Sequence, residues 1–158
     1  MKNIFLSIQE KLSGVSELKH IDKNWGQLLY EKPPVKFPCA LLDVAEIDYS
    51  QLGNLAQTAD DVAVEIIIAN FRLTPSSGKA PRKHNSYAVF DIIKDIHEIL
   101  HGWTNGEFQP LIRVKLKKLD AASGYEIYRV IYLTSWREFK ECNQIPVQIA
   151  PKISTDDE

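Results

Sequence analysis

The sequence predicts a single α+β domain, in the order helix-strand-strand-helix-strand-strand, with the helices packed on a mainly antiparallel or mixed sheet. Apolar residues recur at helical spacing in residues 2–19 and 86–101, and four shorter segments are rich in apolar, β-branched or aromatic residues, with a period of two in DDVAVEIIIANF and LIRVKLKKL. A chain of 158 residues can bury about two thirds of its unfolded surface in one core. We expect this domain to cover residues 1–150 and the acidic segment 151–158 to form a flexible tail.

Both helices are amphipathic. In residues 2–19 an apolar stripe runs from Ile4 to Leu18, with positions three or four residues apart. The helix over residues 86–101 carries a continuous apolar stripe and is expected to end at Gly102, a residue that is favoured directly after a helix.

Four segments are typical of strands. FPCALLDV is entered through prolines, and DDVAVEIIIANF places apolar residues on both faces of a strand. Gly53 and Asn54 lie between these two segments and predict a hairpin. LIRVKLKKL and YEIYRVIYLTSW predict a second hairpin around DAASG, and a further short strand is expected near Val147 and Ile149. The long segment RLTPSSGKAPRKHNS is predicted to be a loop.

The composition is that of an ordinary globular protein, with 44% hydrophobic and 25% charged residues and a net charge of -2. This balance requires neither a nucleic-acid nor a membrane partner, and no apolar run is long enough to span a bilayer. We therefore expect a cytoplasmic protein. Cys39 and Cys142 belong to no C-x-x-C pair, so we expect both to be reduced and Cys39 to be buried. The sequence does not indicate whether these two cysteines meet.

The segment HEILH, from His97 to His101, matches the zinc-protease pattern H-E-x-x-H, in which two His bind zinc and the Glu, here Glu98, acts as general base. A small zinc metallopeptidase is thus an alternative function. A catalytic zinc usually needs a third protein ligand, which the sequence does not supply, and Thr104 stands where the extended pattern has Gly. We expect no catalytic residue, no metal site and no cofactor.

Two sets of basic residues are candidates for contacts with another subunit or a partner. One set lies on a single face of the strand LIRVKLKKL and extends to the neighbouring strand, and the other lies in the long loop. Plain solvent exposure is the alternative for both sets. The candidates are Arg113, Lys115, Lys117 and Arg129 on the strands, and Arg72, Lys79, Arg82 and Lys83 in the loop.

The order of the segments also resembles a known family. A first amphipathic helix is followed by NWGQLLYEKPP, FPCALLDV, QTADDVAVEIIIANF, a long loop, a helix ending in LHGW and a hairpin ending in YLTSW. Over residues 1–137 this arrangement resembles the tail-terminator, or tail-completion, proteins of long-tailed bacteriophages. HEILH and the acidic C-terminal tail are not features expected of that family.

The resemblance implies a structural component of a phage or prophage tail, with no catalysis and no cofactor. Its members form a ring, commonly of six subunits, that caps the tail tube and joins it to the head connector. The implied partners are other copies of the chain, the tube protein, the head-tail connector and DNA in passage. The implied location is the host cytoplasm during assembly and the virion tail afterwards. Another tail or secretion-apparatus assembly protein is a further alternative.

Overall fold

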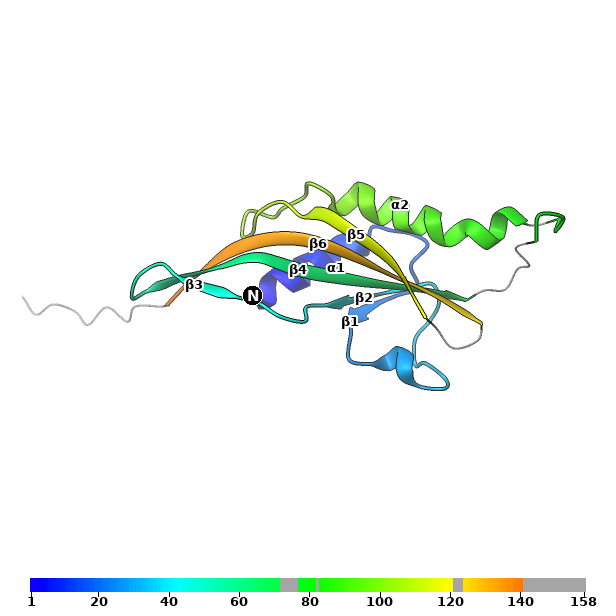
Figure 1. Ribbon diagram of the computed structural model, residues 1–158, viewed down its shortest axis with the longest axis horizontal. Helices are drawn as coiled ribbons and strands as arrows, with labels where there is room; N and C mark the ends of the chain where they lie inside the picture. The colour runs from blue at the N-terminus through cyan, green and yellow to red at the C-terminus, as the bar shows by residue number, and fades with distance from the viewer. Residues whose placement is uncertain (72–76, 82, 121–123, 141–158) are drawn as a thin grey trace, which may run out of the picture.

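A computed structural model describes residues 1–71, 77–81, 83–120 and 124–140. It shows the expected α+β architecture, in which two helices cover one face of a mixed, six-stranded sheet (Figure 1). None of the helices in these ranges is long and apolar enough to cross a membrane.

Both predicted helices are present, and each is shorter than expected. Helix α1 spans Lys2–Leu12, because the chain leaves the helix at Ser13 and continues in turns. Val15 is nevertheless buried in these turns, so the apolar stripe continues beyond the helix. Helix α2 spans Ala88–Leu100 and directly follows a 3-10 helix, η2, Lys83–Tyr87. Gly102 has a φ of 76°, the left-handed conformation expected after the helix end.

The sheet has the order β1-β2-β4-β6-β5, and β3 pairs with one end of β4. The antiparallel pairing predicted for FPCALLDV and DDVAVEIIIANF is present as β2 with β4, but the turn at Gly53 and Asn54 joins β4 to a short strand, β3, that was not predicted. The second predicted hairpin is present as β5 with β6. All pairings are antiparallel except that of β1 with β2. The strands are β1 His20–Lys23, β2 Cys39–Asp43, β3 Tyr49–Gln51, β4 Ala56–Phe71, β5 Ile112–Leu119 and β6 Tyr125–Phe139.

Strand β4 lies at the centre of the fold, and its two faces belong to two apolar clusters. Val64, Ile66 and Ile68 face the helices and pack with residues of α1, α2 and β6 in the main core. Ile67 and Ala69 face the other way. The period-two alternation read from the sequence thus identifies both faces correctly.

A loop covers part of the second face. Strand β1 was not predicted, because its four residues HIDK carry no apolar alternation, and it forms by parallel pairing with β2. The chain then folds over the sheet through the 3-10 helix η1, Gln27–Leu29. The buried Gln27 side chain holds this loop by accepting from Trp25 N–H and donating to the Lys23 carbonyl. Leu28 and Phe37 pack over the second cluster.

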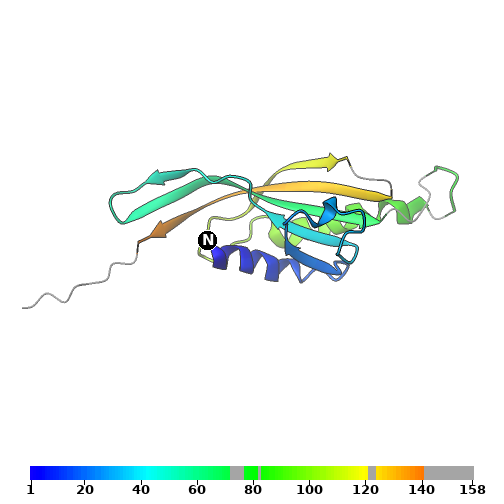
Figure 2. The same ribbon diagram turned by 90° about the horizontal axis from the view of Figure 1, so that it is seen from below.

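A β-bulge interrupts the pairing of β4 with β6 between Ala59 and Val62. Asp61, within the bulge, has a φ of 51°, which is uncommon for a residue other than glycine. On one side of the bulge the sheet lies on the helices. On the other side, β3 and the ends of β4 and β6 extend past the start of α1 as an arm, as Figure 2 shows. We call residues 49–58 and 137–139 the arm.

Candidate functional site

The HEILH segment forms the last turn of α2 and faces β5. The rings of His97 and His101 lie side by side, with centroids 4.6 Å apart. His101 accepts a hydrogen bond at Nδ1 from the backbone N–H of Arg113, at 3.2 Å. His97 Nδ1 is buried and meets no hydrogen-bond partner among the described residues. The pair therefore packs against β5, and His101 holds the start of that strand.

The surroundings of the two histidines oppose a cation. Burial lowers the pKa of His97, and the charge of Arg113 and the neighbouring His101 ring lower it further. Glu98, the general base of the zinc alternative, is 61% exposed and pairs with Lys94 at 3.7 Å, one turn back on the solvent side. Within the described ranges no three His, Cys, Asp or Glu residues come together as metal ligands. Nothing in this geometry favours the zinc alternative.

The basic row expected on β5 is divided between two faces, which corrects the sequence-based alternation. A bulge between Arg113 and Lys115 shifts the register, so Arg113 lies opposite Tyr132 on the face that carries the helices. Lys115 and Lys117 lie opposite Ile131 and Arg129, on the other face. Strict alternation would have kept the three basic side chains together. The extra residue of the bulge turns Arg113 away from the two lysines.

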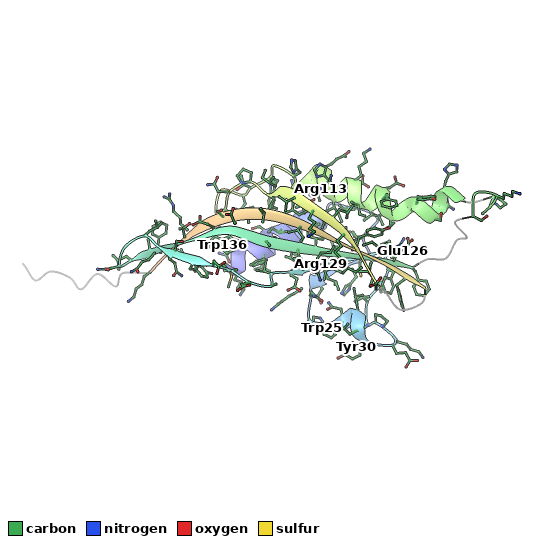
Figure 3. The ribbon with its side chains drawn as sticks, in the orientation of Figure 1. Trp25, Tyr30, Arg113, Glu126, Arg129 and Trp136 are labelled. Atoms are coloured by element: carbon green, nitrogen blue, oxygen red, sulfur yellow. The ribbon has the colours of Figure 1, made fainter. Side chains whose placement is uncertain are left out.

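Arg129 already has a partner. Its Nε lies 3.1 Å from Oε2 of Glu65 on the neighbouring strand β4, and Glu65 is only 13% exposed. Figure 3 shows Arg129 near the middle of the sheet and Arg113 on the edge strand. The pair neutralises Arg129, whereas Lys115 and Lys117, on the same face, have no ion-pair partner among the described residues.

The basic loop is described only in part. Arg72 and Arg82 lie outside the described residues, and so does the side chain of Lys83, whose backbone begins η2. Lys79 is exposed. Cys39 is fully buried, which raises the pKa of its thiol to about 11, and Cys142 lies outside the described residues.

Two exposed apolar surfaces were missed by the sequence analysis. The first is the arm, where Tyr49, Leu52, Leu55 and Phe139 are exposed. The signal was present in LGNL, the turn between β3 and β4, because a hairpin with two leucines at its tip has few core neighbours.

The second surface is the tip of the η1 loop, formed by Trp25, Leu29 and Tyr30. Leu29 is 89% exposed, and the rings of Trp25 and Tyr30 meet edge to face at 6.0 Å. Figure 3 shows the two aromatic residues on a loop that projects from the sheet, away from the arm. We call these three residues the η1 tip. Exposed Trp and Tyr side chains of this kind often anchor protein interfaces.

Comparisons with known proteins add little to this geometry. No family model matches the chain, and a comparison with curated proteins finds no match. Among solved structures, the chain is similar to a chain from the virion of a native gene transfer agent (GTA) particle. The two have 10% sequence identity and a TM-score of 0.44, over 82% of this chain and 90% of that chain.

Proposed function

We propose that this chain is a structural subunit of a phage or prophage tail, which forms a ring, caps the tail tube and joins it to the head connector. The order of elements that resembles the tail-terminator proteins supports this role over residues 1–137. The observation that carries the proposal is the presence of two separate apolar surfaces, the arm at one end of the sheet and the η1 tip on a loop that projects from the sheet (Figure 3).

A closed ring requires this kind of asymmetry. Each subunit of a ring contacts its two neighbours through different surfaces, because head-to-tail contacts are heterologous. The arm offers Leu52, Leu55 and Phe139 at one end of the molecule, and the η1 tip offers Trp25 and Leu29 elsewhere. A short three-stranded arm that exposes both faces gains stability when a neighbour covers it. We propose that the arm and the η1 tip are the two ring contacts.

The basic side chains have a different place in this proposal. Lys115 and Lys117 lie on an exposed edge strand, and Lys79 precedes α2 in an exposed turn. These cations suit contacts with an acidic surface of the tube or connector, or with the phosphates of passing DNA. Arg113 and Arg129 are less suitable, because Arg113 faces Tyr132 and Arg129 pairs with Glu65.

Native mass spectrometry of the purified chain at several concentrations tests the ring. We expect a closed oligomer whose mass is a fixed multiple of 18.0 kDa. Leu29→Asp should shift this oligomer toward monomer, since it places a charge in a ring contact, and its circular dichroism spectrum should stay unchanged. Lys94→Glu, an exposed change on α2, is the matched control and should assemble normally. An oligomer that is indifferent to Leu29→Asp contradicts the assignment of the η1 tip.

Tube capping needs a separate assay. Tube protein from the same phage or prophage is polymerised with and without this chain, and tube lengths are measured by electron microscopy. We expect shorter tubes with density at one end. Lys115→Glu should weaken the capping if the basic edge meets the tube or connector, while the fold is retained. Tubes of unchanged length, with no bound ring, contradict the proposed role.

The same mass spectra test the zinc alternative. A mass increase of one zinc per chain, together with peptidase activity that Glu98→Gln abolishes, would overturn the structural role. For a ring protein we expect Glu98→Gln to assemble as the unmodified chain does, because Glu98 points to solvent and pairs with Lys94.

A further inference from the structure

Strand β5 presents an open edge. It lies at the end of the strand order and pairs only with β6 among the described residues. Its first part is closed, because Arg113 N–H bonds to His101 and Leu111 bonds to Gly102 and Trp103. No described residue bonds to its outer side over residues 114–119. We call residues 114–119 the open β5 edge. An exposed edge of this kind accepts a further strand.

The side chains of this edge define its partner. Val114 and Leu116 are about half exposed, and Lys115, Lys117 and Lys118 are exposed around them. Two such edges that paired with each other would bring lysines opposite lysines, which is unfavourable. The open β5 edge therefore suits a strand that is apolar, carries no positive charge and is followed by acidic residues.

One segment of this chain has that chemistry. In QIPVQIA, residues 144–150, Ile145, Val147 and Ile149 alternate with side chains that are uncharged. The acidic residues Asp156, Asp157 and Glu158 follow within one short stretch of chain. The five residues 145–149 can cover all but one of the six residues of the open β5 edge. We propose that residues 145–149 of one copy add as a strand to the open β5 edge of a neighbouring copy.

The added strand must come from a neighbouring copy, because residues 145–149 cannot reach the open β5 edge of their own chain. Leu116 lies opposite Val130, nine residues back along β6 from Phe139, which is about 30 Å of strand. From Phe139 to Val147 the chain has eight residues, which span at most about 29 Å when fully extended. A chain that must also reverse its direction has no length left for the turn. A neighbouring copy is not subject to this limit on chain length, because the arm places the end of β6 away from the helix-covered part of its own subunit (Figure 1).

Two prolines fit a strand that ends the sheet. Pro146 and Pro151 have no N–H to donate and flank the central residues of the segment. Proline is tolerated on an edge strand and discourages the addition of another strand beyond it. An added strand with this sequence would therefore close the sheet and would not extend it into a fibre.

This inference rests on the self-association that the proposed function requires, but not on the tube or the connector. Cysteine cross-linking tests it directly. Two preparations are mixed in a Cys142→Ser background: one carries Leu116→Cys or Lys117→Cys, and the other carries Val147→Cys or Gln148→Cys. The four combinations cover both faces of the added strand. The remaining Cys39 is fully buried and does not interfere.

We expect one face-matched combination to give a disulfide between the two different chains under mild oxidation. Glu98→Cys replaces the β5 cysteine in the control mixture and should give no cross-link, because it lies on the solvent side of α2. Three results overturn the inference: cross-links in none of the four combinations, cross-links that are equally strong with the control, or an intrachain disulfide when both cysteines are placed in one chain.

Truncation separates the failure of this inference from that of the proposed function. The chain 1–140 lacks the donor segment, and we expect its half-assembly concentration in native mass spectrometry to rise at least about tenfold. Val147→Asp in the full chain should act in the same direction, whereas Ile153→Asp, outside the donor strand, should not. If the chain 1–140 forms the same ring at the same concentration, strand addition is wrong and the ring stands. If neither chain assembles, alone or on tubes, both proposals fail.

Discussion

Strands β4 and β6 pair through two regions, which share the backbone hydrogen bonding of the sheet but differ in the burial of their side chains. Between the bulge and Phe71, both helices cover the pair, and residues such as Ile66 and Tyr132 are fully buried. Beyond the bulge, the same two strands form the arm, where Phe139 is 72% exposed. The backbone ladder continues in both. One pair of strands thus forms part of the core on one side of a bulge and exposes apolar side chains on the other.

The largest difference between the two regions should appear in stability. Ile96 is fully buried where α2 meets the sheet, so Ile96→Ala should lower the free energy of unfolding by about 2–5 kcal/mol through the lost contacts and the cavity. Phe139→Ala in the arm should change the monomer's stability by less than about 0.5 kcal/mol. Urea denaturation at low protein concentration measures both. Equal losses would mean that the arm belongs to the cooperative core.

The bulge separates the two regions, and Asp61 is its strained residue. With φ at 51°, Asp61→Val should cost about 1–2 kcal/mol, because a β-branched side chain is poorly accommodated there. Asp61→Gly is the matched control and should be neutral or slightly stabilising, since glycine adopts this φ freely. Trp136 lies opposite Ala59, next to the bulge, and its fluorescence reports local changes. If Asp61→Val is neutral, the conformation of the bulge is not a constraint.

A smaller effect is expected from the ion pair between Glu65 and Arg129, which lies on the face of the sheet opposite the helices. A double-mutant cycle with Glu65→Gln and Arg129→Met should give a coupling energy of about 0.5–1 kcal/mol, because Glu65 is largely shielded from water. The same cycle at Lys94 and Glu98, both well exposed, should give about 0.3–0.5 kcal/mol. Denaturation of the four variants in each cycle measures both energies. Equal couplings would show that the burial of Glu65 does not strengthen its pair with Arg129.

The smallest effect concerns pH. Burial and the charge of Arg113 lower the pKa of His97, so the unfolded state takes up its proton at a higher pH than the folded state. The contribution of His97 to stability is therefore complete above the ordinary histidine pKa and falls as the pH drops toward the lowered value. His97→Gln should flatten this part of the stability profile, and His84→Gln, an exposed control, should not. Urea unfolding between about pH 5 and pH 7.5 checks the slope, and a profile unchanged by His97→Gln contradicts the shift.

Much of the fold follows from periodicity in the sequence. The α2 stripe and the two-faced alternation of β4 were predicted correctly, because each involves many residues that meet the core at regular intervals. β1 was missed because its conformation depends on parallel pairing with β2, which is a property of the tertiary structure. Alternation on β5 failed at one residue, since a bulge leaves no mark on the hydrophobic pattern and moved Arg113 to the other face.

The candidate surfaces were harder to predict than the fold. The sequence indicated basic residues, and the structure places Arg129 beside Glu65 on a strand far away in the chain. The η1 tip and the arm carry ordinary apolar residues such as Leu29 and Leu55, which sequence patterns assign to a core. Only the position of these residues outside the helical layer shows that they are exposed. For H-E-x-x-H, in contrast, the sequence pattern suggested a site, whereas the structure places Glu98 on the solvent side, where it pairs with Lys94.

The late position of β6 in the sequence also governs when the sheet can be completed during synthesis. β4 is complete at Phe71, but its long partner strand ends only at Phe139, so a ribosome must add 68 residues (139 minus 71) before the pairing is finished. At about 5–20 residues per second, this takes roughly 3–14 s. During that interval β4, a strand with seven buried apolar residues in the folded protein, has one edge open, a state that favours aggregation or binding by a chaperone. The nascent chain is thus most vulnerable between the synthesis of Phe71 and that of Phe139, when β6 completes the pairing.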